Sequence, residues 1–94
     1  MSAEANIGDV VVSARGRDKE KFFLVIESNE KTVRLVNGKE RKVTASKTKN
    51  VKHVKSVYTG ALIDLAWQIN NGESVGNLRL HRAINSILIK KQED

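Results

Sequence analysis

The chain has 94 residues, of which 39% are hydrophobic and 30% are charged, and its formal net charge is +6. This composition is typical of a soluble globular protein, and the length predicts one compact unit whose parts share a core. No apolar run approaches the roughly 20 residues that cross a bilayer, residues 1–6 lack a signal-peptide apolar region, and cysteine is absent. We therefore expect a cytoplasmic protein with no membrane partner, no disulfide and no structural metal.

The positive charge is concentrated in the first part of the chain. Residues 1–58 hold 13 Lys or Arg against 7 Asp or Glu, whereas residues 59–94 hold 4 of each kind. A one-sided excess of cations attracts polyanions, so this distribution favours a nucleic-acid partner, although a merely basic surface is the plainer alternative.

The first 58 residues show a pattern of short strands. Runs of β-branched and aromatic residues bounded by turn residues predict strands over residues 10–14, 22–26, 32–36, 40–44 and 51–57. Asn37-Gly38 predicts a type I′ turn, since both central residues of that turn have positive φ. We expect residues 1–6 to be a flexible tail and residues 7–58 to form a small β-barrel, in a fold that is mainly β with α-helices at the C-terminal end.

The run from Phe22 to Ile26 is the most apolar predicted strand and the candidate for the central one. Side chains alternate between the two faces of a strand, so Phe22, Leu24 and Ile26 share one face and are the better core set. Phe23 lies on the other face. We expect the C-terminal half to cover it, the alternative being a surface that stacks on a partner.

After Gly60 the apolar residues follow a helical period. Leu62, Ala66 and Ile69 predict a first helix that ends at Asn71-Gly72. A second helix is predicted over residues 78–90 with Asn77 as its N-cap. Residues 59–94 should thus form a helical hairpin that docks on the barrel or on a partner, with Tyr58 and Trp67 as packing residues.

The string Ala14-Arg15-Gly16-Arg17-Asp18-Lys19, followed by Lys21-Phe22-Phe23, resembles the KOW motif. It is most similar to that motif in large-subunit ribosomal proteins of the eukaryotic and archaeal type and in their small bacterial RNA-binding relatives; Lys47 to Val54 also resembles the basic stretch that closes their domain. The resemblance covers residues 7–57. It implies an SH3-like five-stranded barrel with Gly16 in the first loop, and binding to rRNA. Glu20 departs from the pattern, because many relatives carry glycine there.

Two clusters of cations are the candidate RNA-binding residues. An arginine guanidinium can grip a phosphate with two hydrogen bonds, and closely spaced cations repel one another unless an anionic partner screens them. Asp18 is interpreted as a structural residue that accepts hydrogen bonds from backbone amides of the turn. The predicted site comprises Arg15, Gly16, Arg17, Lys19 and Lys21 in the first cluster, and Lys39, Arg41, Lys42, Lys47, Lys49, Lys52 and Lys55 in the second.

Because aromatic residues make up only 4% of the chain, recognition should depend on phosphate contacts and RNA shape. His53 is expected to be partly buried at a strand edge, the alternative being a side chain that stacks on or bonds a base. The sequence shows no convergent catalytic motif, so we expect no enzyme activity, no cofactor and no small-molecule substrate.

We therefore expect a ribosome-associated protein that binds structured rRNA of the large subunit, with ribosomal proteins as further candidate partners. The alternative is a protein-interaction adaptor in transcription or ribosome assembly that uses the barrel and the C-terminal helices.

Overall fold

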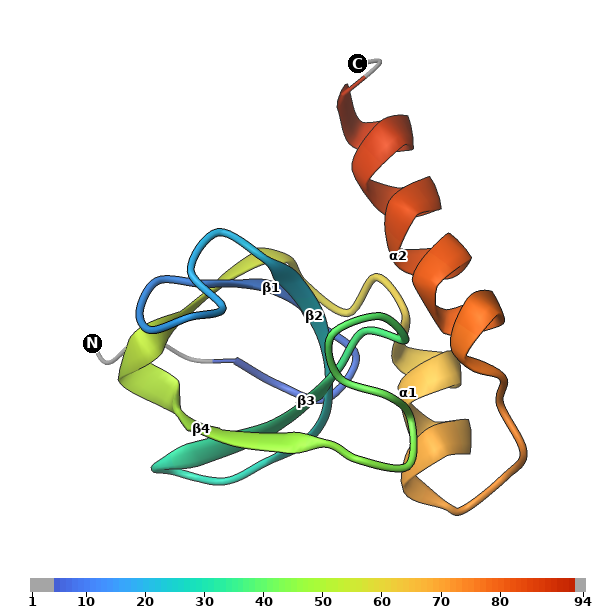
Figure 1. The fold of residues 1–94 in the computed structure, drawn as a ribbon, viewed down its shortest axis with the longest axis horizontal. Coiled ribbons are helices and arrows are strands. Elements are labelled where there is room, and N and C mark those ends of the chain that lie inside the picture. The colour runs from blue at the N-terminus through green and yellow to red at the C-terminus, as the bar shows by residue number, and fades with distance from the viewer. Residues whose placement is uncertain (1–4, 93–94) are drawn as a thin grey trace.

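Residues 5–92, the part of the chain that the computed structural model describes, form a five-stranded antiparallel sheet followed by two α-helices (Figure 1). The strands are β1 (Val10–Ser13), β2 (Phe22–Ser28), β3 (Thr32–Val36), β4 (Lys47–Asn50) and β5 (Val54–Tyr58). A short 3₁₀ helix, η1 (Val51–His53), joins β4 to β5, and the α-helices are α1 (Ile63–Asn70) and α2 (Asn77–Gln92). The predicted succession of five strands and two helices is confirmed.

The sheet is strongly curled. Its strand order is β4-β3-β2-β1-β5, so β2 is central, as predicted, and β4 and β5 form the two edges. In a flat sheet these edges would lie about 19 Å apart, at about 4.8 Å per strand. The three residues of η1 span only about 6 Å. The edges can be joined this way only if the sheet bends back on itself, and register shifts in the β1–β5 and β2–β3 pairs accompany that bend.

Both faces of β2 are buried, each in a different apolar cluster. Leu24 and Ile26 belong to a cluster shared with the helices, whereas Phe23 and Val25 belong to a second cluster inside the curl of the sheet. The prediction that the C-terminal half covers Phe23 is therefore wrong. Its cover comes from neighbouring strands and η1, through Val11, Val33, Leu35, Val51 and Val54.

The two helices pack on the outer face of the sheet. Leu65, Ala66 and Ile69 of α1 and Leu80 and Ile84 of α2 are buried in the same cluster as Leu24 and Ile26 of β2. Polar contacts reinforce this packing, since Asn70 Nδ2 donates to the carbonyl oxygen of Ile26. Figure 1 shows the C-terminal turns of α2 extending past the sheet.

Two predicted details of the helices need correction. Asn77 is the first residue of α2 rather than its N-cap, and its Oδ1 accepts a hydrogen bond from Val43 N at 2.7 Å. The first helix begins at Ile63, and it ends before Asn71, where the end was predicted. Trp67 is not a packing residue, because 48% of it is exposed. Tyr58 of β5 is partly buried and packs against the core cluster that the helices share with the sheet, as predicted.

The predicted strand over residues 40–44 is wrong: residues 37–46 form a loop, and β3 pairs instead with Lys47–Asn50. The buried side chain of Asn37 organises this loop, because its Oδ1 accepts hydrogen bonds from Lys39 N and Arg41 N. Such side-chain bonds replace strand pairing. The turn is also not type I′, since the positive φ found at Gly38 is not shared by Asn37.

At both ends of the predicted barrel, the structure differs from the prediction. Residues 51–53 form η1, so the last strand starts at Val54 and not at Val51. Of the predicted flexible tail, residues 1–4 lie outside the described residues. Ala5 is buried in the second apolar cluster, inside the curl of the sheet, and its carbonyl oxygen accepts a hydrogen bond from Ser28 Oγ.

Replacement of Leu80 by alanine should lower the free energy of unfolding by about 2–5 kcal/mol, because Leu80 is fully buried between α2 and the sheet. Leu78→Ala is the matched control on the same helix. Leu78 is 59% exposed, so its loss should change stability by no more than about 0.5 kcal/mol. Urea unfolding curves measure both, and equal losses would show that α2 does not pack as described.

Candidate nucleic-acid interface

The β1–β2 loop, residues 14–21, is closed by its own backbone hydrogen bonds. Lys19 N donates to the carbonyl oxygen of Gly16 at 3.2 Å, and Glu20 N donates to that of Ser13 at 2.8 Å. Gly16 has a φ of +81°, a conformation that glycine adopts far more readily than other residues.

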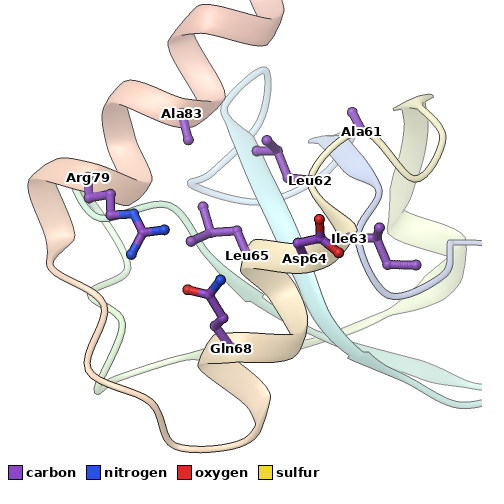
Figure 2. Close-up of a pocket in the computed structure, with 8 residues that line it drawn as sticks. All are labelled: Ala61, Leu62, Ile63, Asp64, Leu65, Gln68, Arg79 and Ala83. Carbon is purple, nitrogen blue, oxygen red and sulfur yellow. The ribbon is translucent and has the colours of Figure 1, made fainter.

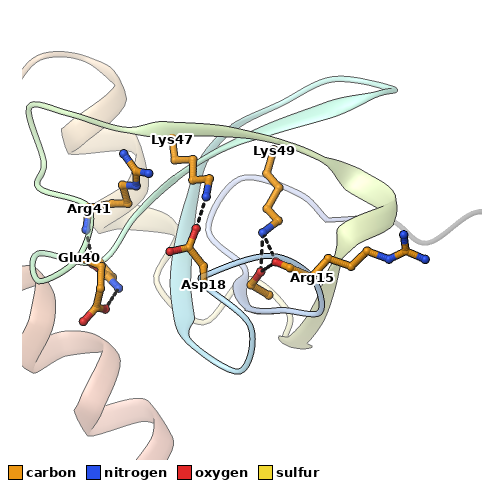
Figure 3. Close-up of polar contacts among 8 residues, drawn as sticks. Arg15, Asp18, Glu40, Arg41, Lys47 and Lys49 are labelled. Atoms are coloured by element: carbon orange, nitrogen blue, oxygen red, sulfur yellow. Dashed lines mark hydrogen bonds and ion pairs between the residues drawn. The ribbon is translucent and has the colours of Figure 1, made fainter.

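An ion pair ties this loop to the edge strand β4. Asp18, which is buried in the loop, accepts a hydrogen bond from Lys47 Nζ, so its partner is a lysine and not the predicted backbone amides (Figure 3). This hydrogen bond lowers the pKa of Asp18 below its usual value of 3.8; burial opposes the shift, and the charges of Lys47, Lys49 and Arg41 support it.

A second lysine of β4 makes an inward contact next to the first. Lys49 is 9% exposed, and its Nζ donates to Ser13 Oγ at 2.7 Å and to the carbonyl oxygen of Arg15 at 2.6 Å. Burial lowers the pKa of Lys49, the positive charge of Lys47 adds to this shift, and Asp18 opposes it. Lys47 and Lys49 point to the same side because they are two residues apart on a strand.

The predicted site residues therefore fall into a buried or partly buried group and an exposed group. Lys49 is buried, and Lys47 and Arg41 are partly buried. Gly16 is exposed in the loop. The remaining predicted site residues have exposed side chains: Arg15, Arg17, Lys19, Lys21, Lys39, Lys42, Lys52 and Lys55. We refer to these eight residues as the outer cations.

Two contacts bring other cation-bearing segments beside the loop. Lys21 Nζ lies 3.5 Å from a carboxylate oxygen of Glu40, which connects the loop to residues 37–46. Ala14 N donates to the carbonyl oxygen of His53 at 2.8 Å, which connects it to η1. The outer cations of the loop, of residues 37–46 and of η1 thus lie on adjoining segments, whereas Lys55 follows on β5. His53 is partly buried, as predicted.

A hollow of about 320 Å³ lies between the two helices (Figure 2). Figure 2 shows Arg79 reaching from α2 toward Leu65 and Gln68 of α1. Apart from Asp64, Gln68 and Arg79, its lining is apolar: Ala61, Leu62, Ile63, Leu65 and Ala83. None of the predicted site residues lines it.

A smaller groove lies between α2 and residues 37–40, and it includes residues that the sequence did not single out as a site. His81 and Asn85 of α2 line it together with Lys21 and Lys39. Their spacing of four residues places both on one helix face, but only the tertiary packing brings that face to the predicted cations.

Within residues 5–92 no helix is long and apolar enough to cross a membrane. The described residues also contain no group of three or more His, Cys, Asp or Glu side chains arranged to hold a metal ion.

Neither a comparison with protein-family models nor one with curated proteins finds a match to this chain. The resemblance to the KOW family remains a prediction.

Replacement of Asp18 by asparagine should lower the free energy of unfolding at pH 7 by about 1–3 kcal/mol, because it removes the buried negative charge that pairs with Lys47 and leaves only an amide oxygen as acceptor. Since the pKa of Asp18 is lowered by folding, the ionised carboxylate stabilises the fold above its unfolded pKa, and this stabilisation disappears as the pH falls through the folded pKa. The difference between the two proteins should therefore shrink below about pH 4.

Chemical unfolding between pH 2.5 and 7 measures this effect. Glu30→Gln removes an exposed carboxylate and should leave the unfolding curves nearly unchanged. A stability difference between Asp18→Asn and the parent protein that is constant across this range would contradict the ion-pair account.

Glu20 is a non-glycine residue in the left-handed conformation, with a φ of +72°. Such backbone strain costs about 1 kcal/mol, so Glu20→Gly should raise the free energy of unfolding by about 0.5–1 kcal/mol. Glu20→Gln removes the charge and keeps the strain, and it should leave stability nearly unchanged. If both variants shift the thermal midpoint equally, charge rather than backbone strain is responsible.

Proposed function

We propose that this chain is a non-enzymatic RNA-binding protein of the cytoplasm, with an SH3-like barrel of the KOW type. The strand order and the three-residue connection between the edge strands support a barrel, as does an inner apolar cluster drawn from β1, β2, β3, η1 and β5. The position of the basic loop, between β1 and β2, agrees with the KOW resemblance. The target that this resemblance implies is structured rRNA of the large ribosomal subunit.

The observation that carries the proposal is the division of the cations into inner and outer groups. Lys47 and Lys49 hold the loop from inside, and this leaves Arg15, Arg17 and Lys19 exposed on a fixed backbone. A loop that is already ordered loses less conformational entropy on binding. Exposed arginines and lysines held in this way suit the regularly spaced phosphates of a folded RNA.

The contact mode follows from the positions of the aromatic residues. Phe23 is fully buried, so the alternative in which it stacks on a partner is wrong, and Phe22 is partly buried. An open platform of aromatic rings for several stacked bases is not available from these two residues. Phosphate contact and RNA shape should therefore supply most of the affinity.

A protein-interaction adaptor is the second candidate, and one observation favours it. Ile63 and Trp67 are four residues apart on α1 and are 43% and 48% exposed. Exposed tryptophan is enriched at protein interfaces. Co-sedimentation with ribosomal subunits before and after nuclease treatment separates the two candidates, because loss after treatment indicates RNA and retention indicates a protein partner.

Replacement of Arg15, Arg17 and Lys19 by alanine should weaken binding to structured RNA without unfolding the chain, since exposed charges contribute little to stability. The slope of log affinity against log salt should become shallower by about 1 for each lost phosphate contact. Filter binding or fluorescence anisotropy at several salt concentrations measures both quantities.

The control variant replaces Arg79, Arg82 and Lys90 of α2 by alanine. These residues are also exposed, and their replacement lowers the net charge by the same amount. By helical spacing Arg79 and Lys90 lie away from the His81 and Asn85 face, and Arg82 lies at its edge, three residues from Asn85. An equal effect of both triple variants would point to net charge alone, and a salt-independent affinity of the parent protein would refute phosphate binding.

A further inference from the structure

The groove between α2 and residues 37–40 adjoins the outer cations and has a volume of about 220 Å³. Two of the outer cations, Lys21 and Lys39, are among its lining residues. The others are Phe22, Asn37, Glu40, His81, Ile84, Asn85 and Leu88.

The walls of this groove are held in place by close contacts between the loop and α2. Gly38 packs so tightly on the start of α2 that a Cβ at this position would clash with the carbonyl oxygen of Asn77. Asn77 Oδ1 also accepts a hydrogen bond from Val43 N at 2.7 Å. The groove is therefore preformed, and a ligand would not have to order it.

The chemistry of the lining divides into an apolar inner wall and a polar rim. Ile84 is buried in the helix-facing core, and Phe22 and Leu88 pack against that core. At the rim, Asn85 Nδ2 lies 3.2 Å from His81 Nε2. The exposed amide of Asn85 uses one N–H in this contact, which leaves its oxygen and its second N–H to bond a ligand.

The charge around the groove selects the kind of ligand. Glu40 is paired with Lys21, so its negative charge is offset, and Lys39 is exposed beside it. A ligand with a flat apolar ring, polar ring edges and a neighbouring phosphate matches the wall, the rim and Lys39 in turn. The volume is below the roughly 300 Å³ at which sites for larger small molecules begin, and a single aromatic ring system is of the right scale.

We propose that this groove binds one unpaired nucleobase of the RNA, which lies against Phe22, Ile84 and Leu88, bonds Asn85 through its edge and places its phosphate near Lys39. This inference rests on the proposed RNA-binding function and adds a base-specific contact to it. Single unpaired bases are the usual sites of specific recognition in RNA, because their faces and edges are free.

Three RNA hairpins of equal length test this contact: one fully paired, one with a single bulged adenosine, and one with an abasic site at the bulge. The full-length protein should bind the adenosine bulge about 5- to 50-fold more tightly than the abasic bulge, in line with the stacking of one base on a ring. Asn85→Ala removes the bond to the base edge and should lower this ratio about 3- to 10-fold. Asn85→Phe, which also lacks that bond, should lower it too, and neither variant should change affinity for the paired hairpin. Ser86→Ala, on the next exposed residue of α2, should preserve the ratio.

Equal affinity for the adenosine and abasic bulges, with salt-dependent binding to the paired hairpin retained, would overturn the base site and leave the RNA-binding function standing. An Asn85→Ala protein that keeps the full ratio would also overturn it. Absence of binding to all three hairpins would instead refute the RNA-binding function, and the base site with it.

Discussion

Two lysines of β4 hold the β1–β2 loop against the sheet, and the arrangement of the candidate interface depends on them. Lys47 donates to the buried carboxylate of Asp18, and Lys49 donates to Ser13 Oγ and to the carbonyl oxygen of Arg15. A buried ammonium group is costly unless its hydrogen bonds are satisfied. Separation of β4 from the loop would leave the Lys49 ammonium group without acceptors, so these contacts also hold the edge strand to the loop. With the loop fixed from inside, Arg15, Arg17 and Lys19 face outward.

The strands and helices were predictable where local pattern and tertiary packing agree. β1, β2, β3 and both helices follow from apolar periodicity and turn residues. The strand expected over residues 40–44 does not form, because Asn37 bonds the backbone of Lys39 and Arg41 locally. The sequence pattern also could not predict that the sheet itself covers Phe23. A strand that is buried on both faces has the same apolar sequence whichever element covers each face.

For the candidate site, the sequence located the cations but not their directions. The alternation of Lys47 and Lys49 with exposed Thr48 and Asn50 was a usable signal that the two lysines share one face. The identity of their acceptors depended on the fold, because Ser13 is 36 residues from Lys49 in the chain and Asp18 is 29 residues from Lys47. The groove at Asn85 was similarly hidden, as it requires α2 to pack beside Lys39. Together, the outer cations and the groove form the surface that we propose to contact phosphates and one base.

The most direct test of the division between inner and outer cations is a map of lysine acetylation rates with and without structured RNA. Bound RNA should protect Lys19, Lys39, Lys42 and Lys52, while Lys49 should react slowly in both states because its ammonium group is buried and Lys90 should react equally in both. Protection of Lys90 with no protection of Lys19 and Lys39, or rapid acetylation of Lys49 in the free folded protein, would contradict the account.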